Sequence, residues 1–169
     1  MLSIYGFEKL KFREKKHRLP SEYYTGEVSV AFTLCLRGSG CFVENEFKET
    51  CVDALHIITA QYKCMVPVYC FMPDHQHIIL TGTTPDSNVM KAIIAYKQRT
   101  GFWLSKHING IRWQKDFYDH VIRSNENIKT QVRYVLDNPV RKGIVPDWQE
   151  YPHTGSVSCS LDDILAGVI

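Results

Sequence analysis

The chain has 169 residues, of which 44% are hydrophobic and 22% charged, and its formal net charge is +2. These values are near the globular average and exclude a disordered, collagen-like or coiled-coil protein. The length predicts one domain of ordinary size. No apolar run approaches the ~20 residues that a bilayer requires. The six cysteines form no CxxC pair, so we expect reduced thiols in a cytoplasmic protein that does not contact a membrane.

Charge is distributed unevenly along the chain. Residues 8–18 hold six Lys or Arg side chains against two Glu, and residues 91–123 hold seven against two Asp. Residues 44–53 are instead acidic. Two basic segments and one acidic segment can attract phosphate groups to one side of a protein. A solubilising surface produces the same pattern, so nucleic-acid binding is one of two interpretations at this point.

The first half of the chain predicts three strands and one helix. Residues 28–36 alternate and are rich in β-branched side chains, which favours a strand. Apolar residues follow i, i+3, i+4 spacing over 45–62, which predicts a helix with Asn45 as its N-cap. Residues 66–72 and 77–80 predict two further strands, joined by a turn at Pro73.

The second half predicts two more helices and one strand. Ser87 is expected to cap a helix that ends near residue 108, and residues 117–122 predict a strand. A further helix begins at Asn125 or Asn127 and stops before Pro139. From Pro146 the pattern is irregular, with a short helix possible at 161–165. The order predicts an α+β fold, an antiparallel sheet with helices packed on it, whose first part is a ferredoxin-like split βαβ unit.

Two histidines at i, i+2 are the first candidate site. On a strand, His75 and His77 point to the same face, and two adjacent imidazoles are a metal-ligand arrangement. Two surface histidines at a hairpin are the alternative. Gln76 must point to the opposite face, toward the helices, where it needs hydrogen-bond partners. A structural zinc site with Cys64 and Cys70 would have an unusual ligand spacing.

A tyrosine and an asparagine are the second candidate site. Tyr134 and Asn138 lie at i, i+4 and therefore share one face of the last predicted helix. Taken alone, a core tyrosine and a helix stop before Pro139 are equally compatible with this pattern.

Three motifs that follow one another along the chain resemble those of a known family. They are Met72-Pro73-Asp74-His75-x-His77, then Trp113-Gln114-x-x-Phe117-Tyr118-Asp119-His120-x-Ile122-Arg123, then Tyr134-x-x-x-Asn138-Pro139-Val140. Over roughly residues 25–155 the chain resembles the single-tyrosine HUH transposases, most closely the REP-associated tyrosine transposase branch. It departs from the family at Gln76, where a hydrophobic residue is usual. The resemblance implies a ferredoxin-like HUH endonuclease fold with a basic arm at 1–24, a catalytic domain at 25–155 and a C-terminal tail at 156–169.

The resemblance also implies roles for individual residues. His75, His77 and Asn138 correspond to metal ligands, for Mg²⁺ or Mn²⁺, and Tyr134 to the nucleophile. The expected reaction cleaves and rejoins single-stranded or hairpin DNA through a 5′-phosphotyrosine intermediate. Relatives act as monomers or as homodimers, so both states are open for this chain.

The DNA-binding candidates combine the basic segments with the middle motif. They are Lys9, Lys11, Arg13, Lys15, Lys16, Arg18, Lys97, Arg99, Trp113, Gln114, His120 and Arg123. Three alternatives stay open. Tyr118 is the rival nucleophile. A metal-dependent nuclease that activates water needs no tyrosine, and a domesticated DNA-binding module would not cut.

Overall fold

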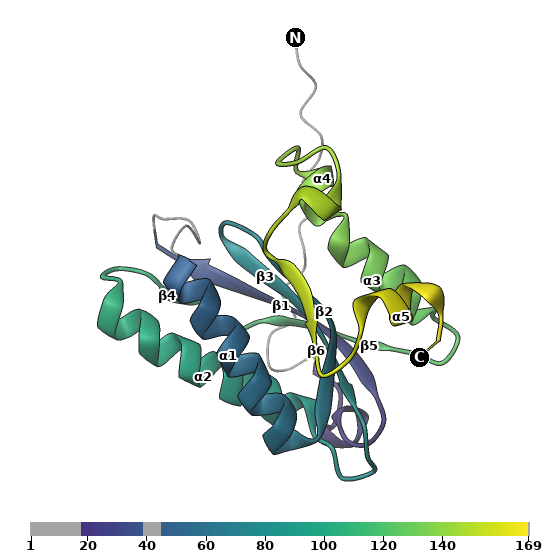
Figure 1. Cartoon of the computed structure of the whole chain (residues 1–169). Helices are drawn as coiled ribbons and strands as arrows, with labels where there is room; N and C mark the ends of the chain where they lie inside the picture. Colours follow the sequence, from purple (N-terminus) through teal and green to yellow (C-terminus); the bar gives the residue numbers. More distant parts are fainter. Residues whose placement is uncertain (1–17, 39–44, 169) are drawn as a thin grey trace.

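A computed structural model describes residues 18–38 and 45–168, which form one antiparallel sheet covered by helices on both faces (Figure 1). The strands are β1 (Ser29–Arg37), β2 (Cys64–Phe71), β3 (His75–Gly82), β4 (Arg112–Trp113), β5 (Tyr118–Ile122) and β6 (Thr154–Val157). Their order is β4-β1-β3-β2-β6, and β5 pairs with the same edge of β1 as β4. The predicted α+β class is therefore confirmed.

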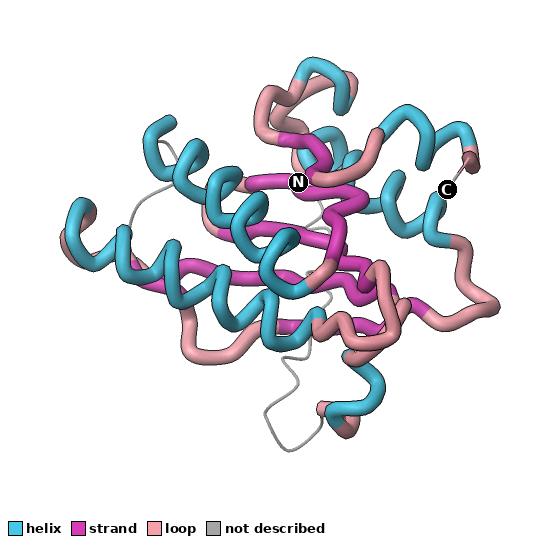
Figure 2. The backbone as a smooth tube through the Cα atoms, turned by 60° about the horizontal axis from the view of Figure 1, so that its bottom comes forward, coloured by secondary structure: helices cyan, strands magenta, loops and turns pink. Residues whose placement is uncertain are grey.

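Two long helices lie side by side on one face of the sheet, and the C-terminal helices lie on the other (Figures 1 and 2). The first pair is α1 (Asn45–Tyr62) and α2 (Val89–His107). The second face carries α3 (Ile128–Leu136) and α5 (Leu161–Ala166), with the single-turn helix α4 (Asn138–Arg141) following α3. Two 3-10 turns, η2 (Ser21–Tyr24) and η3 (Trp148–Glu150), complete the elements.

The side chains of each strand alternate between the two faces of the sheet, so the protein has a hydrophobic core on each face. Phe32 and Leu34 of β1 point into the larger core with α1 and α2. Val68 and Ile79 of the neighbouring strands point into the smaller core, which α3 closes with Val132 and other apolar side chains. Since successive strand residues face opposite sides, the candidate histidines of β3 lie on the α3 side of the sheet.

The local patterns predicted most boundaries well. The helix expected over 45–62 is α1, and Asn127 caps α3 by accepting from the Lys129 backbone N–H. The predicted cap at Ser87 is wrong by one residue, because Asn88 accepts from the Lys91 N–H. The Ser87 hydroxyl instead donates to the carbonyl of Lys63, so it holds the turn before α2.

The second half contains elements that the sequence did not reveal. Pro139 does not end the helical path, since it occupies the first turn of α4, where a missing N–H costs nothing. Strands β4 and β6 were not expected. The predicted boundary between domain and tail at 155/156 falls inside β6, which pairs with β2. Lys9, Lys11, Arg13, Lys15 and Lys16 lie outside the described residues.

No helix in the described ranges is long and apolar enough to cross a membrane.

Candidate active site

His75 and His77 stand side by side on the α3 face of the sheet. Their Nε2 atoms are 3.1 Å apart, and the two rings meet at 90°. The remaining nitrogen of each ring has its own partner: Nδ1 of His75 is 2.6 Å from Asp74 Oδ1, and Nδ1 of His77 is 3.0 Å from Thr33 Oγ1. Hydrogen-bond partners on Nδ1 thus orient both rings, and the two Nε2 atoms lie next to each other.

This arrangement fits two ligands of one cation. Nitrogen ligands at roughly 2.0–2.1 Å from a metal are separated by roughly 2.9 Å at a right angle and 3.3 Å in a tetrahedron, and 3.1 Å lies between these values. Oxygen partners on Nδ1 are the usual support of metal-bound histidines. Burial, followed by the charges of His75 and Arg141, lowers the pKa of His77 to about 3. His77 is therefore neutral at pH 7, the form that binds metals.

Gln76 points to the opposite face, as predicted, and is buried between the sheet and α1 and α2. The Tyr96 hydroxyl donates to Gln76 Oε1 at 2.5 Å, and Gln76 Nε2 donates to Cys51 Sγ at 3.3 Å. The polar residue between the two histidines is thus held by hydrogen bonds from both helices.

Helix α3 and the start of α4 bring Tyr134 and Asn138 to the face that carries the histidines. The buried α3 residues Val132, Val135 and Leu136 pack on β2 and β3. Tyr134 is 58% exposed, so its ring is accessible from solvent. Asn138 is buried, and its Nδ2 donates to the carbonyls of Tyr134 and Val135.

Arg141 is a site residue that the sequence analysis missed. Its guanidinium carbon lies 3.9 Å from the centroid of the Tyr134 ring, and its Nη2 donates to Asn138 Oδ1 at 2.8 Å. Asn138 Oδ1, the atom expected to bind a metal, is therefore engaged by a cation of the protein itself. The signal that could have found Arg141 is its place seven residues after Tyr134, two helical turns along one face.

Strand β5 borders the site through alternate residues. In the strand register, Tyr118 of β5 is paired with Thr33 of β1, and Thr33 is paired with His77 of β3. Tyr118 therefore lies on the same face of the sheet as His77, two strands away from it. His120 shares this face and pairs with Glu126 at 2.9 Å. Asp119 points the other way and is buried against Tyr24, whose hydroxyl donates to it at 2.5 Å. Burial and Asp119 raise the pKa of Tyr24 to about 12. Asp119 therefore has a structural role.

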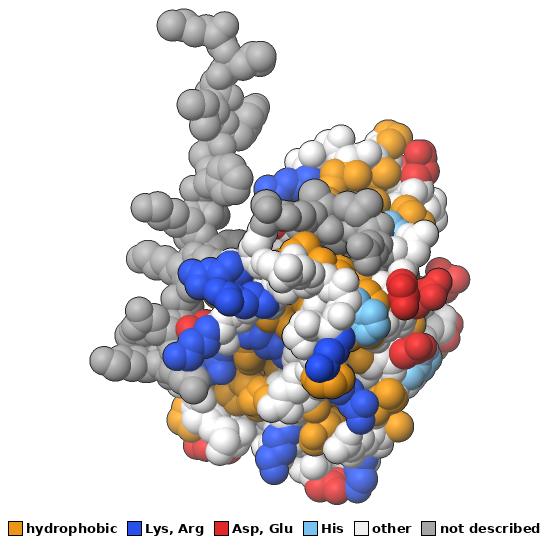
Figure 3. All heavy atoms as spheres, turned by 90° about the vertical axis from the view of Figure 1, so that its left-hand side faces the viewer, with side chains coloured by type: hydrophobic (Ala, Val, Ile, Leu, Met, Phe, Trp, Pro, Cys, Tyr) orange, Lys and Arg blue, Asp and Glu red, His pale blue; other side chains and the backbone are white. Residues whose placement is uncertain are grey.

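A basic groove of about 540 Å³ lies between α2 and the β4 edge. Figure 3 shows Lys and Arg side chains bordering apolar side chains on this side of the molecule. Its cationic lining residues are Arg18, Lys97, Arg112 and Lys115. Of the other DNA-binding candidates, Gln114 lines the groove, whereas Arg99 and Arg123 are exposed elsewhere. Trp113 lines the groove with a largely buried ring, whose Nε1 donates to Thr100, so it supports the wall by packing.

One residue of the groove, Gln114, is hydrogen-bonded to the strand that pairs with the histidine strand. The backbone N–H of Gln114 donates to the Cys35 carbonyl, and Cys35 is the register partner of His75. Gln114 Nε2 also donates to the next carbonyl, that of Leu36. The C-terminal end of β1 thus joins the groove and the histidine pair.

The zinc alternative is wrong. Cys64 pairs with Gly82 at the far end of β3, whereas Cys70 pairs with His77. Among the described residues, no group of three His, Cys, Asp or Glu side chains converges on one point.

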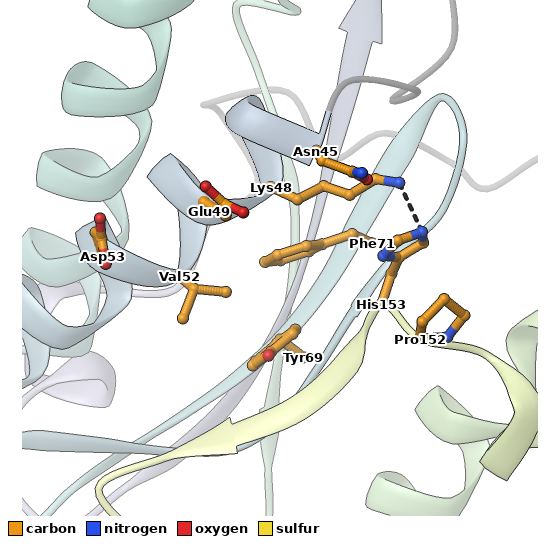
Figure 4. A pocket seen from close by; sticks show the side chains of 9 residues that line it. All are labelled: Asn45, Lys48, Glu49, Val52, Asp53, Tyr69, Phe71, Pro152 and His153. Carbon is orange, nitrogen blue, oxygen red and sulfur yellow. Dashed lines mark hydrogen bonds between the residues drawn. The ribbon is translucent and has the colours of Figure 1, made fainter.

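A second cavity, of about 330 Å³, lies on the α1 side of the sheet (Figure 4). Figure 4 shows Phe71 and Tyr69 beneath the first turns of α1, with Lys48 and His153 at one side. Lys48 Nζ is 2.6 Å from His153 Nε2, and burial, then the charge of Lys48, lowers the pKa of His153. This cavity opens on the face opposite the paired histidines, so it is separate from them.

Comparison with known proteins identifies the family. The family described as Transposase IS200 like matches residues 25–138, which is more than half of the chain and includes both histidines, Tyr134 and Asn138. The chain belongs to the IS200-like transposase family. The resemblance inferred from the three motifs is thereby confirmed.

Individual relatives place this IS200-like transposase near one branch. A protein of Haemophilus influenzae, provisionally named a REP-associated tyrosine transposase, is 25% identical over 120 residues, which cover 64% of this chain and 63% of the relative. The REP-associated tyrosine transposase of Escherichia coli is 26% identical over 89 residues, 52% of this chain and 51% of the relative. The chain thus spans between half and two thirds of these relatives.

A solved structure shares the fold. It is described as a REP-associated tyrosine transposase bound to a REP hairpin, and it matches with a TM-score of 0.67 and 22% sequence identity. The match covers 78% of each chain. The sheet and helices described above are therefore the HUH fold.

Proposed function

We propose that this IS200-like transposase cleaves and rejoins single-stranded or hairpin DNA through a covalent 5′-phosphotyrosine on Tyr134. The observation that carries the proposal is the pair of adjacent Nε2 atoms, 3.1 Å apart, on the sheet face that α3 covers. The same helix presents an exposed tyrosine. Two ligands and a nucleophile on one face are what metal-assisted phosphoryl transfer requires.

His75 and His77 would hold one divalent cation, with Asn138 as the third protein ligand. Mixed nitrogen and oxygen donors with open positions suit Mn²⁺ or Mg²⁺. Such a cation supplies charge stabilisation for the phosphoryl oxygens and orients the phosphate.

Tyr134 supplies the nucleophilic oxygen. A bond forms between Tyr134 Oη and phosphorus, and the bond from phosphorus to the 3′ oxygen breaks. The phenol loses its proton, and the leaving 3′ oxygen takes one up to become a hydroxyl. Because the phosphodiester energy is kept in the covalent bond, another 3′ hydroxyl can reverse the step and join a different strand.

Unpaired DNA suits the basic groove. Single strands bind to basic grooves, and Arg18, Lys97, Arg112 and Lys115 line this groove. Gln114 of the groove is hydrogen-bonded to Cys35, the register partner of His75. The solved relative bound to a REP hairpin supports a hairpin as the substrate.

A covalent adduct tests the proposal. Wild type, Tyr134→Phe and Tyr118→Phe are each incubated with a labelled hairpin carrying a single-stranded flank and Mn²⁺, then run on a denaturing gel. We expect a DNA-shifted protein band from wild type and Tyr118→Phe, and none from Tyr134→Phe. The exposed Tyr134 ring makes loss of one oxygen nearly neutral for folding, so DNA binding should persist.

Each other result of this experiment indicates a different mechanism. A band that survives Tyr134→Phe and disappears in Tyr118→Phe makes Tyr118 the nucleophile. Cut DNA without any band indicates the nuclease that activates water. Bound but uncut DNA indicates the non-cutting module.

A further inference from the structure

Arg141 connects the parts of the site. Besides facing the Tyr134 ring and Asn138 Oδ1, its Nη1 donates to the Tyr134 carbonyl at 3.0 Å. One guanidinium therefore contacts both residues that the proposed function assigns to α3 and α4. The helical path continues through Asp137 into α4, so Arg141 lies two turns after Tyr134 and its side chain reaches back to that residue.

The guanidinium of Arg141 keeps N–H donors that its contacts with Tyr134 and Asn138 do not use. Within residues 18–38 and 45–168, no carboxylate forms an ion pair with Arg141. A guanidinium has five N–H donors, and these contacts use two, so others can bind an anion.

We propose that Arg141 is a positioning residue that works as a latch between two arrangements of the site. In the arrangement seen, it holds the Tyr134 ring and occupies Asn138 Oδ1. When His75 and His77 bind a cation, Asn138 Oδ1 turns to the cation, and the released guanidinium binds a non-bridging oxygen of the phosphate. This inference rests on the proposed function, because it takes Asn138 as a ligand and Tyr134 as the nucleophile.

Physical chemistry favours the exchange. A divalent cation and a guanidinium repel each other at short range in a partly buried site. Arginine pairs with phosphate oxygens through parallel N–H donors. The latch therefore makes a distinctive prediction: removing Arg141 should strengthen metal binding and weaken catalysis.

Calorimetric titration of Mn²⁺ without DNA is the first test. We expect Arg141→Ala to bind Mn²⁺ roughly fivefold more tightly than wild type, because a competing hydrogen bond and a like charge are lost. Arg133→Ala, which removes an equal charge from an exposed position beside Tyr134, should bind as wild type does, and His77→Ala should not bind. In the Asn138→Ala background, Arg141→Ala should bring a smaller gain, since only the loss of the like charge remains when the hydrogen bond to Asn138 is already absent.

Adduct formation with the hairpin is the second test. At saturating Mn²⁺, Arg141→Ala should form the Tyr134 adduct at least roughly tenfold more slowly, and Arg141→Lys should recover part of the rate. Unchanged Mn²⁺ affinity in Arg141→Ala, or Mn²⁺ binding by neither protein, overturns the latch. If wild type forms no adduct, the proposed function is refuted. The Mn²⁺ titration without DNA still tests whether Arg141 competes with the cation for Asn138.

Discussion

Gln76 occupies the middle of the histidine pair, where its amide is buried on the face opposite the site. The sequence was sufficient to predict that its side chain points to the helices and needs partners. It could not predict which residues they are, since Cys51 and Tyr96 come from two different helices. Gln76 therefore fixes the strand that carries both histidines by hydrogen bonds that only the tertiary structure defines.

Gln76→Leu should destabilise the protein by about 1–3 kcal/mol, because it leaves the buried Tyr96 hydroxyl without its acceptor. The double variant Gln76→Leu with Tyr96→Phe should recover part of that loss, since both partners then become apolar. Urea unfolding of the two single variants and the double variant measures the coupling. Simple additivity of the two losses would show that the Tyr96–Gln76 hydrogen bond does not carry the effect.

Helices and strands divide into those that local patterns define and those that depend on distant partners. The spacing of apolar residues over 45–62 is local, and α1 spans those residues, with Asn45 as its first helical residue and not its cap. Strand β4 has only two residues, and most residues of β6 are small and half-buried. Neither segment therefore shows the alternation of apolar and polar residues that identifies a strand in a sequence. They exist because β1 and β2 offer free edges to pair with. Arg141 is hard to predict for a related reason, because a proline after Asn138 indicates the end of a helix, whereas Pro139 lies in the first turn of α4.

Helix α5 should contribute to stability although it is short and follows an irregular segment. Ile164 is 2% exposed in the smaller core with Val132 and Leu136. We expect Ile164→Ala to lower the free energy of unfolding by about 2–4 kcal/mol through the cavity it leaves. Val168→Ala is the control, because Val168 is 73% exposed and surface changes stay within about 0.5 kcal/mol. Equal losses in chemical denaturation would mean that α5 is not part of the core.

At the scale of the whole molecule, the sheet separates packing from chemistry. One face carries α1, α2 and the larger core, and the other carries the histidines beneath α3. The basic groove lies at the β4 edge, where the two sides meet at the end of β1. The uneven charge of the sequence predicted a basic surface. Only the fold shows that one groove is lined by Arg18, Lys97, Arg112 and Lys115.

Salt dependence tests whether this groove binds the DNA backbone. Each phosphate contact contributes about 0.7 to 0.9 to the slope of log K against log salt concentration, because a bound cation displaces condensed counterions. Arg112→Ala and Lys115→Ala should each reduce the slope for a single-stranded or hairpin oligonucleotide by about that amount. Lys129→Ala, which removes a charge from α3 near the end of α5, should leave it unchanged. Fluorescence anisotropy at several salt concentrations gives the slopes. Equal reductions in all three variants would show that net charge, and not the groove, attracts DNA.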